Sequence, residues 1–440
     1  MTSLSLWLWS LGGRSAVLVL GVLNLVIIAR ALGPYGRGQY FLFASIVLIL
    51  TTIADLGLTQ SALAYGGLSR VDAGRLHRRL LRHALVLSLV TCVAGALVLG
   101  IAGEALVPNM PRAWLIGATI AVPATLYVSY WSAMMVSLRR VPTVNAIQIG
   151  VGVLTVCANL VLVATTGDAG VAVTIYVLSF AVQATAMLIL WPPANAQEEP
   201  ADRLGGEMVR FGLRFYPSLL GSLIWSRAAV FLLNALVGPE AVGVYSIAQQ
   251  FAERALLPVQ SFQDVLYNRM ARLPRGEAID SMNRFLRIGI ALMVPLLAGA
   301  FLLSGPIISV LFSEAFVRSV DVLHIMLIGG AATVVPALLS TYFLGHLRRP
   351  GLLSILSWAN GVMTVILLLS LVPRHAETGA ALATVISQVL GTAALVAIYL
   401  RVTHTAFAVA FVPRRADLVV VRDQVRAILR RPVDAGGIPS

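Results

Sequence analysis

Charged residues are scarce in this chain of 440 residues, and lysine is absent altogether. Only 12% of the residues are charged, whereas a soluble domain carries about 25%. Hydrophobic residues make up 58%, and the mean hydropathy is +0.88. This composition leaves too little polar side chain to cover a soluble domain, so we expect a protein that crosses a membrane several times.

Motifs for catalysis and for metal or nucleotide binding are also missing. The two cysteines, Cys92 and Cys157, fall inside apolar runs without a Cys or His partner nearby, so redox and metal sites are not expected. There is no Walker motif and no His, Asp and Glu cluster with ligand spacing, which disfavours an ATP-driven pump. We therefore predict no catalytic residue, no metal and no organic cofactor. A proton or sodium gradient remains the candidate energy source.

The net charge of +13 resembles that of a nucleic-acid-binding protein, but its distribution does not. All 32 basic residues are arginines, and most lie in short loops at alternate ends of the apolar runs. The positive-inside rule accounts for this pattern. Nucleic-acid binding is therefore not expected.

Twelve continuous apolar runs, each about 20 residues long, can cross a bilayer as helices. Membrane β-strands would instead alternate apolar and polar residues. The first six expected spans are 11–29, 39–64, 84–107, 114–138, 143–165 and 170–191. The second six are 211–236, 242–267, 287–312, 322–345, 351–372 and 379–400.

Arginine counting predicts the orientation of these spans. One set of loops holds 17 arginines and the opposite set, which we expect to contain Arg30, Arg37, Arg112, Arg318 and Arg374, holds 5. The rule places the rich side, and with it both termini, in the cytoplasm. An even number of spans agrees with this orientation.

One phrase occurs twice in the sequence. Leu32-Gly33-Pro34, followed by Gly38 and Tyr40, matches Val237-Gly238-Pro239, followed by Gly243 and Tyr245, at an offset of 205. A second pair of landmarks, Arg140 with Gly170 and Arg349 with Gly379, repeats at an offset of 209. We therefore predict two tandem copies of one six-helix unit, an arrangement common in transporters.

The expected fold is an all-α polytopic membrane protein with two pseudo-symmetric six-helix lobes around a central cavity. The lobes would span 1–192 and 211–401, joined by a cytoplasmic linker at 193–210 that contains most of the proline-rich polar stretch 192–200. A basic cytoplasmic tail occupies 402–440. It forms either an amphipathic helix on the membrane surface or a tail without fixed structure.

Several stretches resemble the polysaccharide transporter family, which comprises the O-antigen and exopolysaccharide flippases of the multidrug/oligosaccharidyl-lipid/polysaccharide exporter superfamily. The similarity rests mostly on glycine, proline and tyrosine landmarks. The matching stretches are Ala29 to Tyr40, Ala54 to Leu58, Phe211 to Pro217, Val237 to Tyr245 and Gly379 to Thr384.

The resemblance implies two lobes around a cavity that opens alternately to either face of a bacterial cytoplasmic (inner) membrane. It also implies a cargo, an oligosaccharide linked to undecaprenyl pyrophosphate, and a role in polysaccharide biosynthesis. Polysaccharide polymerases and glycosyltransferases would be candidate partners, besides membrane lipids. Because cavity residues vary widely in this family, no functional side chain is carried over.

Arginines at membrane depth are the first candidates for a binding site, because an unpaired charge there is costly. A guanidinium group stays ionised and binds phosphate oxygens through a bidentate fork. We predict that Arg227 and Arg254 bind the pyrophosphate and that Arg14 and Arg214 guard the cytoplasmic mouth. The alternative is an internal salt bridge from Arg227 or Arg254 to a carboxylate.

Polar residues form a stripe along the span at 242–267, which predicts a face turned toward a cavity or another helix. Gln249, Gln250 and Gln260 belong to this stripe or lie beside it, and Asn24 on the first span is a further candidate contact for the cargo. Glu253 and Asp55 are candidates for ion coupling, although Asp55 lies in an Asp-Leu-Gly turn that can simply end a helix. Amides such as Asn24 also commonly join neighbouring helices.

Three functions fit the sequence. A lipid-linked oligosaccharide flippase agrees best with the deep arginines. A drug/cation antiporter of the same superfamily would need an anionic or aromatic cavity. A non-transporting scaffold that recruits polysaccharide enzymes through the basic tail is the third. An enzyme is the least expected because no catalytic cluster or large loop is present.

Overall fold

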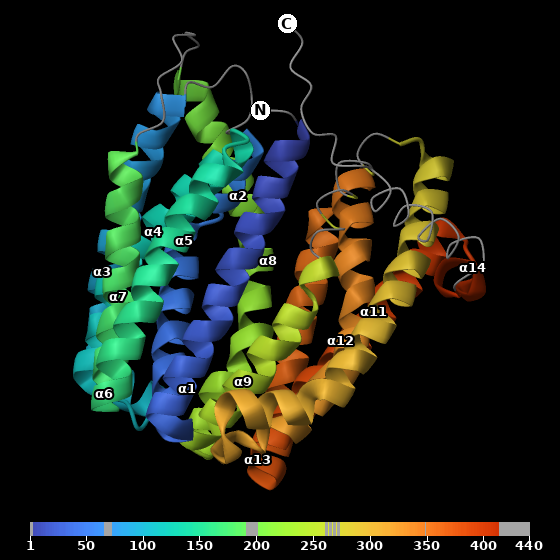
Figure 1. Cartoon of the computed structure of the whole chain (residues 1–440). Helices are drawn as coiled ribbons and strands as arrows, with labels where there is room; N and C mark the ends of the chain where they lie inside the picture. The colour runs from blue at the N-terminus through green and yellow to red at the C-terminus, as the bar shows by residue number, and fades with distance from the viewer. Residues whose placement is uncertain are drawn as a thin grey trace, which may run out of the picture. The chain divides into compact units, whose positions relative to one another are not determined.

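Helices make up nearly all of the described structure (Figure 1). The computed structural model describes residues 3–65, 73–190, 201–259, 263, 266, 270, 273–347 and 349–412. No β-strand occurs in these parts of the chain. The all-α polytopic fold expected from the apolar runs is confirmed.

The first half of the chain contains eight α-helices and one π-helical turn in its described residues. They are α1 (Ser3–Asp55), α2 (Leu58–Tyr65), α3 (Ala73–Leu106), α4 (Arg112–Ser137), α5 (Val141–Ala158), the π-turn Asn159–Val163, α6 (Ala164–Thr166), α7 (Ala169–Ile189) and α8 (Ala201–Leu236). The second half contains α9 (Pro239–Ala255), α11 (Arg275–Phe312), the 3-10 turn Glu314–Phe316, α12 (Ser319–Thr341), the π-turn Tyr342–His346, α13 (Pro350–Thr403) and α14 (Phe407–Phe411).

Nine helical segments in the described residues are long and apolar enough to cross a membrane. Two of them, Ser15–Asp55 and Gly351–Thr403, contain 41 and 53 residues. At 1.5 Å per residue these are about 60 and 80 Å long, at least twice the roughly 30 Å of bilayer hydrocarbon. Each therefore holds two of the predicted spans. The remaining prediction, 242–267, begins as α9 and continues outside the described residues.

Single residues with non-helical backbone angles divide the two long segments. Gly33 breaks α1 with φ 65°, and Ala376 breaks α13 with φ 45°. The sequence predicted a loop at the first site, with Arg30 and Arg37 in it. That assignment is wrong, because Pro34 restarts the helix at once, as proline does at a first helical position. Figure 1 shows α1 descending from the N-terminus and turning back.

Four residues with positive φ form two pairs that follow the sequence repeat. Gly33 and Gly238, with φ 65° and 122°, lie 205 residues apart. Gly167 and Ala376, with φ 61° and 45°, lie 209 residues apart. These separations equal the two offsets of the sequence repeat, so the chain breaks its helices at equivalent places in both copies.

The two copies of the repeated phrase also contact each other. A Cβ atom on Gly38 would overlap the carbonyl oxygen of Pro239, and one on Gly243 would overlap the carbonyl oxygen of Pro34. Gly38 and Gly243 are equivalent in the repeat, and so are Pro34 and Pro239. The contact is therefore reciprocal, as in an interface built around a two-fold axis, and it leaves no room for any side chain.

The chain divides into two compact units. The first comprises Met1–Ala248, Gly305–Val322 and Ser357–Thr384, and the second comprises the remaining segments from Gln249 onward. The lobe boundaries expected from the sequence remain a prediction. Helix α8 already begins at Ala201, so residues 201–210 of the expected linker are helical.

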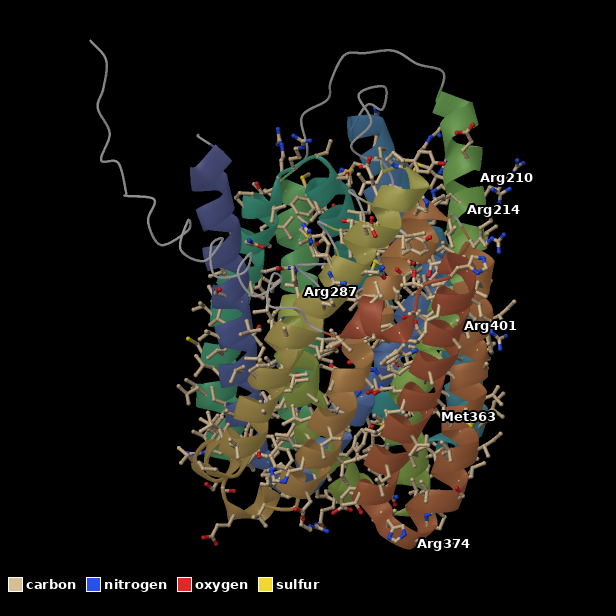
Figure 2. The ribbon with its side chains drawn as sticks, turned by 90° about the vertical axis from the view of Figure 1, so that its right-hand side faces the viewer. Arg210, Arg214, Arg287, Met363, Arg374 and Arg401 are labelled. Carbon is tan, nitrogen blue, oxygen red and sulfur yellow. The ribbon has the colours of Figure 1, made fainter. Side chains whose placement is uncertain are left out.

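Buried polar contacts hold the second unit together. The Tyr399 hydroxyl donates to Asn283 Oδ1 at 2.7 Å. Arg287, counted among the cytoplasmic loop arginines, is instead buried in α11, and its Nη1 donates to the Val409 carbonyl of α14 at 2.5 Å (Figure 2). The tail after Val412 lies outside the described residues.

The glycine contact predicts the effect of adding one methyl group. Gly38→Ala and Gly243→Ala should each destabilise the protein by about 1–3 kcal/mol, because overpacking forces the backbones apart. The double variant should cost less than the sum, since both methyl groups disrupt one contact. Thermal unfolding in detergent measures this. Gly150→Ala is the control, because a Cβ there has no neighbour within 4 Å. Equal stability of Gly38→Ala and the control would contradict the assignment.

Candidate functional site

Arg227 lies on α8, nine residues before the helix ends at Leu236, or about 13 Å along the axis. Its side chain is half-buried, and its Nε is buried without a hydrogen-bond partner among the described residues. The guanidinium carbon lies 5.7 Å from the centre of the Phe41 ring. A cation–π contact of this kind stabilises a charge but leaves its donors available.

Aromatic rings lie near this arginine. Tyr176 is close enough to Arg227 to interact with its charge. The Tyr176 ring packs edge-on against Tyr40 and Phe43, with centroids 5.9 Å apart in both pairs. Helices α1 and α7 supply these rings, and α8 supplies the cation. The result is a cationic position with aromatic walls.

Arg37 is a second cation in this cluster, and it was not among the candidates chosen from the sequence. It is only 2% exposed, and its guanidinium lies 5.3 Å from the Tyr40 ring and 5.6 Å from the Phe41 ring. Phe41 therefore contacts both Arg37 and Arg227. The sequence could have identified Arg37 as a member of this cluster. Tyr40 and Phe41 follow it by three and four residues, and residues at these spacings share one helix face.

Arg254 lies on α9 and is half-buried. Its Nη1 donates to the backbone oxygen of Gln250 at 3.1 Å and to the Gln250 side chain at 3.4 Å. Beside this pair, Gln249 Nε2 donates to Glu253 Oε1 at 2.9 Å. The predicted polar stripe thus forms two i,i+4 pairs within its own helix. The Gln250 side-chain nitrogen is buried without a partner in the described structure.

The salt-bridge alternative for the deep arginines is not seen. Among the described residues of the first unit, Arg227 is not within ion-pair distance of Asp55, and among those of the second unit, Arg254 is not within ion-pair distance of Glu253. Arg254 experiences the charge of its neighbour Glu253, but in this part of the chain no nitrogen–oxygen contact of ion-pair length joins them.

Arg30, on the same unit as Arg227, is engaged with backbone oxygens. It donates from Nε to the Leu311 carbonyl at 2.7 Å and also to the Val310 carbonyl. It thereby caps the C-terminal end of α11, where free carbonyls attract a cation.

Arg318 is engaged with carboxylates. It contacts Glu240 at 2.5 Å and Glu377 at 3.2 Å. Arg227 differs from both of these structural arginines, because no carboxylate or carbonyl partner is found for it among the residues that the structure describes.

Asp55 caps the short helix α2. Its carboxylate accepts hydrogen bonds from the backbone nitrogen of Gly57 at 3.0 Å and from that of Thr59 at 3.1 Å, and from the Thr59 hydroxyl. Asp is among the preferred N-cap residues. Both carboxylate oxygens are therefore used in the turn, as the Asp-Leu-Gly sequence allows.

Asn24 joins two helices. Its Oδ1 accepts a hydrogen bond from Asn159 Nδ2, at the start of the π-turn, at 2.7 Å, and it is a hydrogen-bonding neighbour of the Tyr40 hydroxyl. Two further predicted site residues lie outside this description. Arg14 belongs to α1 but its side chain is outside the described structure, and Gln260 is outside it entirely.

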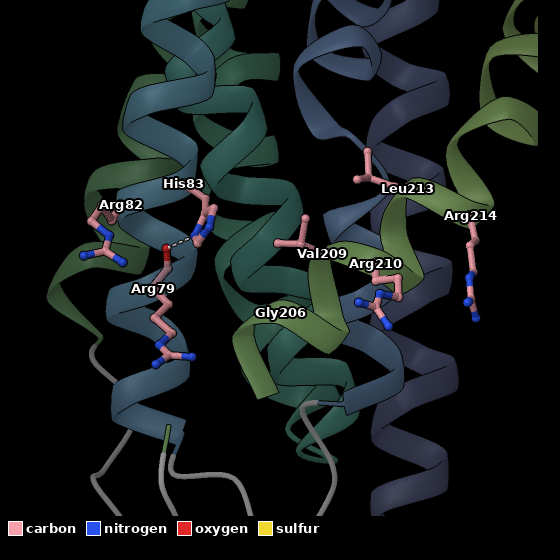
Figure 3. A pocket seen from close by; sticks show the side chains of 8 residues that line it. All are labelled: Arg79, Arg82, His83, Gly206, Val209, Arg210, Leu213 and Arg214. Carbon is pink, nitrogen blue, oxygen red and sulfur yellow. Dashed lines mark hydrogen bonds between the residues drawn. The ribbon is translucent and has the colours of Figure 1, made fainter. Parts of the chain in front are cut away.

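Arg214 lies elsewhere on α8, beside a basic pocket of about 700 Å³ (Figure 3). Helices α3 and α8 form this pocket. The positive-inside rule accounted for most of its arginines in the sequence, although Arg79, Arg82 and His83 have the three- and four-residue spacing of one helix face. The lining residues are Arg79, Arg82, His83, Gly206, Val209, Arg210, Leu213 and Arg214.

Comparison with known proteins identifies relatives of this chain. The sequence model of the family described as "Polysaccharide biosynthesis protein" matches residues 3–273. No curated protein matches the sequence. Among solved structures, the lipid II flippase MurJ in an inward closed conformation is similar at 13% identity, with a TM-score of 0.66, over 99% of this chain and 94% of that one.

Two further structures are similar over most of their length. An inward-facing multidrug resistance MATE family transporter of the MOP superfamily matches at 17% identity with a TM-score of 0.64, over 90% of this chain and 98% of the other. A mutant form of the Vibrio cholerae MATE transporter VcmN matches at 14% identity with a TM-score of 0.64, over 92% of this chain and 97% of that one. At these identities the likeness shows a shared fold.

The capping role of Asp55 can be separated from ion coupling by two substitutions. Asp55→Ala should lower stability by about 1 kcal/mol, because a helix cap is lost, whereas Asp55→Asn should lower it less, since the amide oxygen keeps one of the two accepting positions. Thermal unfolding in sodium and in choline buffers measures both effects. A sodium-dependent stabilisation of the unaltered protein that Asp55→Asn abolishes would instead assign Asp55 to an ion site.

Proposed function

Because this chain belongs to the polysaccharide biosynthesis protein family, within the multidrug/oligosaccharidyl-lipid/polysaccharide exporter superfamily, we propose that it is a lipid-linked oligosaccharide flippase. The chain is a multi-pass membrane transporter by family and fold. The proposed cargo is an oligosaccharide on undecaprenyl pyrophosphate, moved across the bacterial cytoplasmic membrane for polysaccharide biosynthesis. A glycosyltransferase would make this cargo and a polymerase would consume it.

The environment of Arg227 is the main observation that supports this proposal. An arginine inside a membrane protein normally has a carboxylate or carbonyl partner, because an unpaired charge there is costly. Arg227 contacts the Phe41 ring and has a buried donor without an acceptor among the described residues. A diphosphate would supply the missing acceptors, since guanidinium binds phosphate oxygens through two parallel hydrogen bonds.

Arg254 and the glutamines would complete the contacts with the cargo. Arg254 is held by Gln250 through bonds of 3.1–3.5 Å, which are long for charge-assisted hydrogen bonds. A phosphate can replace them at little cost. The amides would then bind sugar hydroxyls, and two further arginines would lie at the cytoplasmic mouth. The amides are Gln249, Gln250, Gln260 and Asn24, and the mouth arginines are Arg14 and Arg214.

The two copies of the repeat suggest how the site would open alternately to each face. Reciprocal contacts between equivalent residues can be broken together when one half of a transporter rocks against the other. The Gly38–Pro239 and Gly243–Pro34 contacts would separate in the opposite state. The arginine-rich loops would face the cytoplasm, and the lipid tail would stay in the bilayer while the headgroup crosses.

Glu253 is the better-placed candidate for coupling to a proton or sodium gradient. It is exposed, and among described residues its hydrogen-bond partner is Gln249. Its carboxylate is therefore available to bind a cation, whereas the oxygens of Asp55 already cap α2.

A drug/cation antiporter is the principal alternative. Aromatic rings bind cations well, but here Arg37 and Arg227 already lie beside Phe41. A cationic drug at this place would be repelled by both. A non-transporting scaffold that uses the basic tail is a further alternative, and no observation on the described residues favours it.

The proposal predicts the effect of removing the deep cations. Arg227→Ala should lower the rate of cargo translocation at least tenfold, because a charge-assisted hydrogen bond contributes about 1.5–3 kcal/mol. Adding Arg254→Ala should abolish surface polysaccharide. Arg227→Lys should be intermediate, since lysine keeps the charge but not the bidentate fork. Surface polysaccharide is measured in cells that depend on this protein.

Arg401→Ala provides the matched control, because Arg401 is exposed near the end of α13 and its side chain points away from the helices (Figure 2). It should leave surface polysaccharide unchanged. Normal polysaccharide in the Arg227→Ala, Arg254→Ala double variant, at unchanged protein abundance, would overturn the proposal.

A further inference from the structure

We propose that the basic pocket between α3 and α8 is a separate binding site for a membrane-lipid headgroup that carries two phosphate groups. The pocket has a volume of about 700 Å³ and is lined by four arginines and one histidine. The site shares no residue with the Arg227 and Phe41 cluster, but it includes Arg214, which is proposed above to lie at the cytoplasmic mouth.

Two helices distant in sequence bring the basic groups together. Arg79 and Arg82 come from α3, while Arg210 and Arg214 come from α8 (Figure 3). His83 Nδ1 donates to the Arg79 carbonyl at 2.7 Å, which fixes its ring against α3. Among the described residues, no hydrogen bond to the Nε2 atom of that ring is found. No carboxylate is among the described residues that line this pocket.

The positive-inside rule explains why arginines occur at this end of the helices, but not why they gather around one hollow. The rule is satisfied equally well by arginines that spread into solvent. The guanidinium groups of Arg82, Arg210 and Arg214 around one hollow repel each other, and a like-charge cluster of this kind is stabilised when an anion neutralises it. Their gathering at a hollow, rather than the number of charges, therefore points to an anionic ligand.

The lining indicates a phosphate of a lipid rather than a soluble anion. Val209 and Leu213 contribute apolar walls next to the arginines, and Leu213 is 48% exposed. An apolar wall beside a cationic rim suits a molecule with a phosphate head and a hydrocarbon portion. Basic pockets between membrane helices bind lipid headgroups in this way, and bidentate arginines match two neighbouring phosphates.

Two lipids share this chemistry. The diphosphate could belong to the proposed cargo, which carries a pyrophosphate, or to a bilayer phospholipid with two phosphates such as cardiolipin. The first source rests on the proposed function, deepens it, and would make the pocket a loading site. The second source is independent of the proposed function.

Gly206 offers a way to close the pocket without changing its charge. It lines the hollow within α8, and a Cβ atom there would have no neighbour within 4 Å. Gly206→Trp should therefore fill the pocket while the helix stays intact. Gly276→Trp on α11 is the matched control, because Gly276 is also exposed and helical with open space around it.

The experiment measures lipid binding by native mass spectrometry of the purified full chain with undecaprenyl pyrophosphate, cardiolipin and phosphatidylcholine. It is carried out in the unaltered protein and in the Arg227→Ala, Arg254→Ala variant, so that the proposed transport site does not contribute. We expect at least one diphosphate lipid to bind tenfold more tightly than phosphatidylcholine in both proteins. Arg82→Gln with Arg210→Gln, and separately Gly206→Trp, should each lower this affinity at least tenfold.

The matched charge control removes two exposed arginines outside the pocket, through Arg374→Gln and Arg401→Gln (Figure 2). This control and Gly276→Trp should bind like the unaltered protein. Tenfold preference for undecaprenyl pyrophosphate assigns the pocket to the cargo, while equal or stronger cardiolipin binding assigns it to the bilayer. Unchanged affinity in both pocket variants, or equal binding of phosphatidylcholine, would overturn the proposal.

Discussion

A bilayer gives no hydrogen bonds to the groups that it surrounds, and this constraint shapes most of what the chain does. The backbone satisfies itself by forming helices through nearly all of the described residues. Two other arginines donate hydrogen bonds to backbone oxygens. Arg30 donates to the Leu311 carbonyl at the end of α11, and Arg287 donates to the Val409 carbonyl of α14. Arg227 differs from them, because its guanidinium lies over the Phe41 ring and its Nε has no hydrogen-bond partner among the described residues. The proposed function gives this cation a use, which is to bind the diphosphate of the cargo.

The internal repeat supplies the second constraint. Equivalent breaks at Gly33 and Gly238, and at Gly167 and Ala376, give both copies the same pattern of helix ends. The two copies of the repeated Gly-Pro sequence pack against each other, so equivalent residues form both sides of the contact. A contact formed by equivalent residues requires no separate optimisation of two surfaces.

The fold class and the membrane spans could be predicted from the sequence, because they follow from apolar runs and a repeat that extend over many residues. Turns and side-chain contacts could not, because each depends on the conformation of one or two residues. Apolar runs and the repeat predicted the all-α fold and the spans. The loop expected around Arg37 does not exist, because Gly33 and Pro34 turn the chain within one residue. Spacing revealed the polar stripe on α9, but the pairing of Gln249 with Glu253 depends on side-chain conformation. The basic pocket could not be predicted from the sequence, because it forms where α3 and α8 approach each other. No local sequence pattern encodes that approach.

Translocation by the purified protein is the most direct test of the central claim. Liposomes containing only this chain would be loaded with fluorescent oligosaccharide on undecaprenyl pyrophosphate, and a membrane-impermeant quencher would report which leaflet holds the label. We expect the protein to equilibrate or concentrate the labelled lipid across the bilayer, and a monophosphate analogue to cross more slowly. Labelled lipid that stays in its original leaflet, in vesicles where the same protein transports a cationic dye, would contradict the flippase assignment.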